Sequence, residues 1–169
     1  MAFFKANNPE ENDMSNLLLP TDPNFQKATS NLKNLRGIDA ASIDSYAEKL
    51  ATTTASVLAA KADIIFALFY GNLTVKITTD SYKNKNGDVD IWGIGAAGGT
   101  SIGMMYTAYD NWDAFFMNVT AYHVQGVAEG GGFLQVNWFI SNGTPVGQFN
   151  GAMGGAGALE AGGAWKWKG

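Results

Sequence analysis

The sequence predicts an all-β protein: a compact eight-stranded antiparallel β-barrel, closed or sandwich-like, preceded by one amphipathic helix and an irregular N-terminal arm. Two observations carry this prediction. From residue 62 onward, apolar and polar residues alternate in short segments separated by turn signals, as in all-β barrels and sandwiches. In addition, 18 of the 21 glycines lie between Gly93 and Gly169, where closure of a small barrel requires sharp bends and close backbone approach.

Length and composition restrict the protein to one domain with a tail. The chain has 169 residues, and its 46% of apolar residues lies well above the range of disordered chains. A net charge of -4 and a single arginine, Arg36, argue against a nucleic-acid surface, which needs clustered cations. Cysteine is absent, which excludes disulfides and thiolate metal sites.

Residues 1–38 are predicted to form a flexible or partly ordered arm. They contain three of the four prolines and many Asn, Ser and Thr residues, with only short apolar patches such as Leu17–Leu19. These leucines would either clasp the barrel or dock on a partner. The first residues show no signal peptide, so we expect a cytoplasmic protein or export by a non-classical route.

Residues 39–169 are predicted to form the helix and the barrel domain. Asp39 or Ser42 can cap a helix that runs to about Ala60, and its apolar positions recur at helical spacing: Ile43, Tyr46, Ala47, Leu50, Val57 and Leu58. The run Thr52–Thr54 loses rotamer freedom in a helix and predicts a frayed or bent middle.

Eight strand segments follow the helix. The first two, 62–69 and 72–80, are divided by a bend or bulge at Gly71, and residues 83–88 form a turn. The pair Asn142-Gly143 predicts a type I′ hairpin turn. The remaining segments are 89–95, 99–108, 114–127, 133–140, 144–153 and 159–168.

No residue pattern indicates an active site, a cofactor or a metal. His123 is the only histidine, no Gly-x-Ser-x-Gly elbow accompanies it, and it lies within an ordinary strand pattern. Asp88 and Asp90 supply too few oxygen ligands for calcium. We therefore expect a protein that is not an enzyme and has no catalytic residue, no cofactor and no metal site.

Three neighbouring residues are the candidate contacts for a ligand or partner: Trp112, Tyr109 and Asp110. Trp112 stands in a polar segment, Tyr109–Asp113, where an indole could stack on a sugar or anchor a partner. The alternative is that its side chain plugs one end of the barrel. Trp165 and Trp167 alternate with lysines, so both are expected to face the core.

The region from about Gly95 to Gly169 resembles the virulence-associated proteins (Vap family) known from the actinobacterial pathogen Rhodococcus. The similarity lies in six stretches of the chain: Gly95–Gly99, Met105–Thr107, Trp112–Phe116, Gly132–Phe139, Asn142–Phe149 and Ala164–Trp167. The resemblance implies an eight-stranded barrel after an N-terminal arm, without a recognised catalytic site. It also implies an exported factor that acts on host endolysosomal membranes.

The sequence thus predicts a non-enzymatic Vap-like barrel, a virulence or interaction factor that contacts a membrane or a host protein. One alternative is a small lectin-like or lipid-binding barrel that uses Trp112 and its neighbours. The other is a structural or immunity-like protein whose arm docks on a partner. No nucleic acid is expected among the partners, and the oligomeric state stays open.

Overall fold

The computed structural model describes residues 20, 22–127, 132–153 and 156–169, and within them an all-β closed antiparallel barrel with accompanying helices. Three helices precede the barrel: α3 (Pro23–Ser30), α4 (Leu32–Leu35) and α5 (Ala40–Thr52). The strands are β1 (Leu58–Ile77), β2 (Asn86–Thr107), β3 (Ala121–Val127), β4 (Phe133–Phe139), β5 (Pro145–Met153) and β6 (Ala156–Ala164), with η1 (Asp80–Tyr82) between β1 and β2 and α6 (Trp112–Asn118) between β2 and β3.

The barrel closes because one long strand pairs with both ends of a curled sheet. The strand order is β1-β2-β5-β4-β3-β6, and β2 also pairs with β6. Residues 101–107 of β2 pair with β5, and residues 93–98 of the same strand pair with β6. The other edge of β2 pairs with β1 over almost its whole length. No edge of the β5-β4-β3-β6 sheet is therefore left unpaired.

The expectation of eight strands is wrong for the part of the chain that the structure describes, which has a six-stranded sheet. The segments expected at 62–69 and 72–80 form one continuous strand, β1, and those at 89–95 and 99–108 form β2. Each of these strands bends instead of ending. In β1 the register shifts between Leu68 and Tyr70, so the bend expected at Gly71 is confirmed within three residues.

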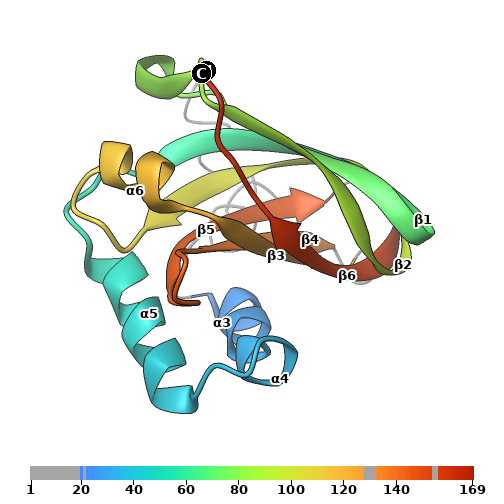
Figure 1. Ribbon diagram of the computed structural model, residues 1–169, viewed down its shortest axis with the longest axis horizontal. Helices are drawn as coiled ribbons and strands as arrows, with labels where there is room; N and C mark the ends of the chain where they lie inside the picture. Colours follow the sequence, from blue (N-terminus) through green and yellow to red (C-terminus); the bar gives the residue numbers. More distant parts are fainter. Residues whose placement is uncertain (1–19, 21, 128–131, 154–155) are drawn as a thin grey trace, which may run out of the picture.

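The bend folds the two-stranded β1–β2 ribbon back on itself (Figure 1). The amide of Thr78 donates to the carbonyl of Ala59 at 2.8 Å, so the two ends of β1 lie side by side. At the bend, a Cβ on Gly71 would overlap the backbone of Ile65 and Phe66. Only glycine permits this close approach of the two halves of β1.

The segment 114–127, expected as one strand, begins as a helix. Residues 112–118 form α6, and β3 starts only at Ala121. The Asn111 side chain caps α6 by accepting a hydrogen bond from the Ala114 amide at 2.9 Å. The cap was missed because the following residues, Ala-Phe-Phe-Met, read equally well as a buried strand.

Aromatic side chains fill the barrel interior next to α6. Leu134, Val136 and Trp138 of β4 face inward and are fully buried, as their alternation predicts. Trp165 and Trp167 are also buried, 5.3 Å apart between ring centroids, which confirms their expected place in the core. Phe115 of α6 lies edge-on to Trp138 at 5.7 Å, so the helix closes this end of the barrel.

The β4–β5 hairpin is confirmed, but its turn is not type I′. Ile140 and Thr144 are joined by a hydrogen bond from the Ile140 amide to the Thr144 carbonyl at 3.1 Å, which leaves a three-residue loop. Only Gly143 has a positive φ, of 86°, whereas a type I′ turn also needs one at the preceding residue. The loop matches the three-residue hairpin with a left-handed glycine.

The described part of the N-terminal arm is helical, so the expectation of irregular structure is wrong for residues 23–35. Helices α3, α4 and α5 lie together against the outer surface of the sheet (Figure 1). The cap at Asp39 is confirmed, because its carboxylate accepts from the Ser42 amide at 2.9 Å. The α5 helix ends at Thr52, within the threonine run and well before residue 60. Leu17–Leu19 lie outside the described residues.

A polar network joins these helices to the barrel. Gln135 of β4 donates to the carbonyl of Phe25 at 3.0 Å, and Gln148 of β5 donates to the hydroxyl of Thr29 at 2.7 Å. Asn137, Gln148 and their neighbours are fully buried although they occupy the outer face of the sheet. The outer face of β4, which carries Gln135 and Asn137, is thus covered by the helices.

Candidate functional site

The three residues predicted as ligand or partner contacts lie together at the junction of β2 and α6. Trp112 is buried, with 3% of its surface exposed, and its indole N–H donates to the carbonyl of Ser56 at 2.5 Å. Tyr109 is half-buried and Asp110 is exposed. A buried indole offers no stacking face to a sugar, so the structure places Trp112 as the barrel-end plug. This burial argues against a stacking platform, and contact of Trp112, Tyr109 and Asp110 with a ligand or partner stays a prediction.

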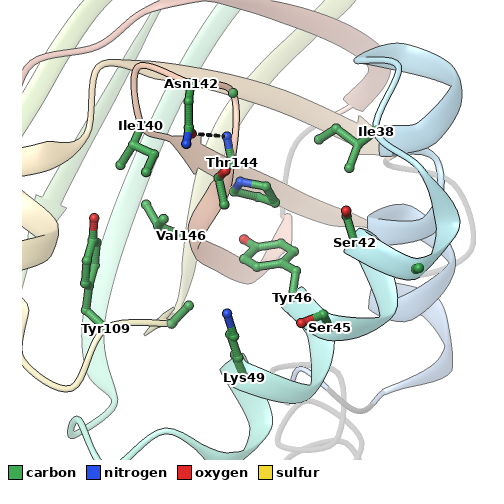
Figure 2. A pocket seen from close by; sticks show the side chains of 14 residues that line it. Ile38, Ser42, Ser45, Tyr46, Lys49, Tyr109, Ile140, Asn142, Thr144 and Val146 are labelled. Atoms are coloured by element: carbon green, nitrogen blue, oxygen red, sulfur yellow. Dashed lines mark hydrogen bonds between the residues drawn. The ribbon is translucent and has the colours of Figure 1, made fainter.

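Tyr109 lines a hollow on the surface, which we call the α5 groove. The groove has a volume of about 700 Å³ and lies between α5, the β2–α6 loop and the β4–β5 hairpin. Figure 2 shows Lys49 and Tyr46 of α5 pointing into it, with Tyr109 and Val146 opposite. The hairpin loop closes one side, where the Thr144 amide donates to the side-chain oxygen of Asn142 at 3.0 Å.

The walls of the α5 groove are fixed by buried hydrogen bonds. The Tyr46 hydroxyl donates to the side-chain oxygen of Asn137, 2.8 Å away, or to the carbonyl of Gly147, 2.6 Å away. Burial raises the pKa of the Tyr46 phenol well above its usual range, so it stays protonated and can keep donating. At the other end of α5, the Thr53 hydroxyl donates to the carbonyl of Tyr109 at 2.8 Å.

A second surface stands out at the bend of the β1–β2 ribbon, which we call the ribbon tip. It consists of exposed large apolar and aromatic residues: Ile65 at 75% exposure, Leu68 at 71%, Phe69 at 66%, Tyr70 at 48% and Trp92 at 66%. The rings of Tyr70 and Trp92 are in contact, with centroids 4.7 Å apart. In Figure 1 this bend forms the end of the molecule opposite α6. Large apolar side chains gathered on a surface mark an interaction site.

The backbone of the ribbon tip is strained at Leu68. Its φ of 62° makes it the one non-glycine residue with positive φ in the described ranges. An aliphatic residue in this conformation costs about 1–2 kcal/mol relative to the ordinary one. Leu68 therefore has both an unfavourable backbone conformation and an apolar side chain exposed to water. Backbone strain of this kind is concentrated at functional sites.

Sequence reasoning missed the ribbon tip, although a signal was present. A strand with one wet face should carry polar residues at alternate positions, yet the run Ile64–Tyr70 has none. Residues 64–73 and 91–99 contain no charged side chain at all. No interaction surface was predicted for this run, since continuous apolar segments usually belong to buried strands.

His123 of β3 lies in a small hollow of about 350 Å³ beside Arg36, Trp92 and Glu160. Its Nε2 is 3.6 Å from the Glu160 carboxylate, and neither ring nitrogen has a hydrogen-bond partner among the described residues. Burial lowers the pKa of the His123 imidazole, a shift that the Glu160 carboxylate opposes. No nucleophile accompanies the pair within this hollow, whose other lining residues are Arg36, a tryptophan, an alanine and two glycines.

Metal ligands and membrane-spanning helices are both absent from the described residues. Within them, no three His, Cys, Asp or Glu side chains come close enough to hold a metal ion. The Asp88 carboxylate instead accepts a hydrogen bond from the side-chain amide of Asn72 at 2.8 Å. No helix in these ranges has the length and hydropathy to cross a bilayer.

Comparison with known proteins gives a consistent result. The model of the Rhodococcus equi virulence-associated protein family matches residues 20–168, which include both the helices and the barrel. No curated protein matches the chain. Among solved structures, VapD from the intracellular pathogen Rhodococcus equi superposes with a TM-score of 0.57 at 20% identity, over 67% of this chain and 97% of that chain.

VapB from the same organism superposes with a TM-score of 0.52 at 19% identity, over 67% of this chain and 96% of that chain. At these identities the two structures establish a shared barrel fold, and each of them covers two thirds of this chain. The family model, by contrast, spans almost all of the described residues. The chain belongs to the Rhodococcus equi virulence-associated protein family.

Proposed function

We propose that this protein is a non-enzymatic virulence-associated factor that acts by contacting a membrane through the ribbon tip. The observation that carries the proposal is the exposure of Ile65, Leu68, Phe69, Tyr70 and Trp92 at one projecting bend. Water solvates these side chains poorly, and burying one of them fully is worth about 1.5–3 kcal/mol. A lipid surface can accept the whole bend at once.

The chemistry of the ribbon tip favours lipid over a charged surface. Residues 64–73 and 91–99 carry no charge, and the Asp90 carboxylate lies beside the Tyr70 hydroxyl at the border of the tip. The apolar side chains can therefore insert while this carboxylate stays in water. Tyr70 and Trp92 have an apolar ring with a polar end, the combination enriched where a membrane meets water. Because the chain has a net charge of -4, anionic lipids offer it no general attraction.

Liposome flotation of the full chain tests the proposal. We expect flotation with phosphatidylcholine vesicles, no stronger flotation with anionic vesicles, and weak dependence on salt, at neutral and at acidic pH. Phe69→Ser should weaken flotation. Met117→Ser is the matched control, because Met117 is 83% exposed but lies on α6, at the opposite end of the barrel.

Two outcomes would contradict this reading. Equal losses for Phe69→Ser and Met117→Ser would show that general hydrophobicity, and not the ribbon tip, drives binding. Absence of flotation with every lipid would refute the membrane contact and favour a host protein or a sugar as the partner.

A further inference from the structure

The α5 groove has an electrostatic character opposite to that of the chain. Lys49 is the only charged residue among those that line it, whereas the chain as a whole carries a net charge of -4. The Lys49 side chain points into the groove, and neither a hydrogen bond nor a salt bridge of its ammonium group occurs within the described ranges. The Ser45 hydroxyl lies one helical turn before Lys49 on the same groove face, whereas the Ser42 hydroxyl already donates to the Asp39 carboxylate at 3.0 Å. The Lys49 ammonium and the Ser45 hydroxyl together suit an anionic group.

The rest of the groove is largely apolar. Ile38 forms one end of it, and Ile140, Pro145 and Val146 of the β4–β5 hairpin form the wall opposite α5. The volume of about 700 Å³ falls within the range of small-molecule sites, about 300–1,000 Å³. An apolar wall with one cation at its side fits a ligand that has an apolar body and one anionic head.

The groove is formed before any ligand arrives. Tyr46 anchors the middle of α5 to the sheet through Asn137 and Gly147, and Thr53 anchors its end to Tyr109. A site with fixed walls avoids the entropy cost of ordering them on binding. This groove is therefore suited to bind a ligand and is not just a gap between two mobile elements.

We propose that the α5 groove binds a single-chain amphipathic anion, an alkyl carboxylate or alkyl phosphate. The alkyl chain lies along Ile38, Ile140 and Val146, and the head group accepts hydrogen bonds from the Lys49 ammonium and the Ser45 hydroxyl. This site is separate from the ribbon tip. The proposal therefore does not depend on the proposed membrane contact.

Isothermal titration calorimetry with the full chain tests the ligand class. Sodium dodecanoate and dodecyl phosphate, both below their micellar concentrations, distinguish the two head groups. We expect binding of at least one of them, weaker binding of dodecanol and no binding of acetate, since both the chain and the charge contribute. Equal affinity for dodecanol and dodecanoate would overturn the role of the anion.

Variants of the two walls locate the site. Lys49→Gln should weaken binding about tenfold, as expected for loss of a charge-assisted hydrogen bond, whereas Lys27→Gln on the exposed face of α3 should leave it unchanged. Ala41→Trp places an indole in the groove and should abolish binding. Ala40→Trp is its control, because Ala40 is exposed on the same helix and does not line the groove.

Thermal melting of each variant confirms that it is folded. Phe69→Ser, which alters the ribbon tip, should bind dodecanoate like the unmodified chain. No dodecanoate or dodecyl phosphate binding, or binding that neither Lys49→Gln nor Ala41→Trp weakens, would overturn the proposal and leave the membrane contact unaffected.

Discussion

Replacing Leu68 by glycine should stabilise the fold and weaken membrane binding at the same time. Leu68 combines a φ of 62° with 71% exposure, so its side chain makes little contribution to the core while its backbone is held in an unfavourable conformation. In most proteins a large-to-small substitution lowers stability. An increase here would show that the leucine is retained for a purpose other than folding.

The size of both effects follows from the structure. Removing the unfavourable left-handed conformation of Leu68 stabilises the folded chain by about 1–2 kcal/mol. The greater freedom of glycine in the unfolded chain lowers the stability by about 0.5–1 kcal/mol. A net gain of about 0.5–1 kcal/mol corresponds to a rise of roughly 1–4 °C in melting temperature. Full burial of a leucine is worth about 1.5–3 kcal/mol. Since 71% of Leu68 is available for insertion, its loss should weaken vesicle binding about 5- to 30-fold.

Thermal melting and vesicle flotation of the same preparations give the two readouts. Ile65→Gly is the matched control: Ile65 is 75% exposed at the same tip, but it has no positive φ. It should lose binding to a similar degree and also lose stability, because no strain is relieved. A lower melting temperature for Leu68→Gly, or unchanged flotation, would refute the reasoning that links strain at this residue to membrane contact.

Three further substitutions test the core and the buried histidine. Trp112→Ala should lower the free energy of unfolding by about 3–5 kcal/mol, measured by urea denaturation, because the indole is buried. A variant that keeps its stability but no longer binds a partner would instead support a contact role for Trp112. Gly71→Ala should cost about 1–3 kcal/mol, since the new Cβ would overlap the backbone of Ile65, whereas Gly98→Ala, with open space around it, should be close to neutral in the same melts. Burial lowers the pKa of His123 below its usual 6.5, so on acidification the unfolded chain takes up a proton before the folded chain does. The free energy of unfolding should therefore fall as the pH drops below 6.5. His123→Gln should make this pH dependence weaker, and an identical pH dependence in both proteins would contradict the lowered pKa.

The fold class could be predicted from the sequence because alternation and turn chemistry are local signals. Leu134, Val136 and Trp138 alternate in the sequence and face the interior together. The strand count failed at β1 and β2, because a glycine that bends a strand and a glycine that ends one look the same in sequence. What decides between them is the pairing of β2 with both β5 and β6, which depends on residues far apart in the chain.

The candidate site was predicted less well, for a related physical reason. Trp112 was a candidate contact because its sequence neighbours are polar, with a barrel-end plug as the alternative. Asn111 uses its side chain to begin α6, and the helix then turns the indole inward. No surface role was predicted for the aromatic residues of the ribbon tip, because apolar runs are normally buried. Sequence hydropathy describes what a side chain would prefer. At the ribbon tip, apolar side chains that favour burial are exposed to solvent, and such a conflict is expected mainly at functional sites.

The outer face of β4 and β5, which is rich in Gln and Asn side chains, is the surface on which the helices pack as part of the fold. Gln and Asn side chains hydrogen-bond equally well to water and to a helix, so the pattern Gln135-x-Asn137 could not distinguish an open face from a covered one. The side chain that decides the matter is Phe25 of α3, which is fully buried and packs edge-on against Phe133 at 5.3 Å. A partner that captured residues 22–38 would have to expose Phe25 at a cost of about 1.5–3 kcal/mol, while the amides would simply rehydrate. Partner docking through this part of the arm therefore competes with the fold. The ribbon tip and the α5 groove carry no such cost, because both are already formed and open to solvent.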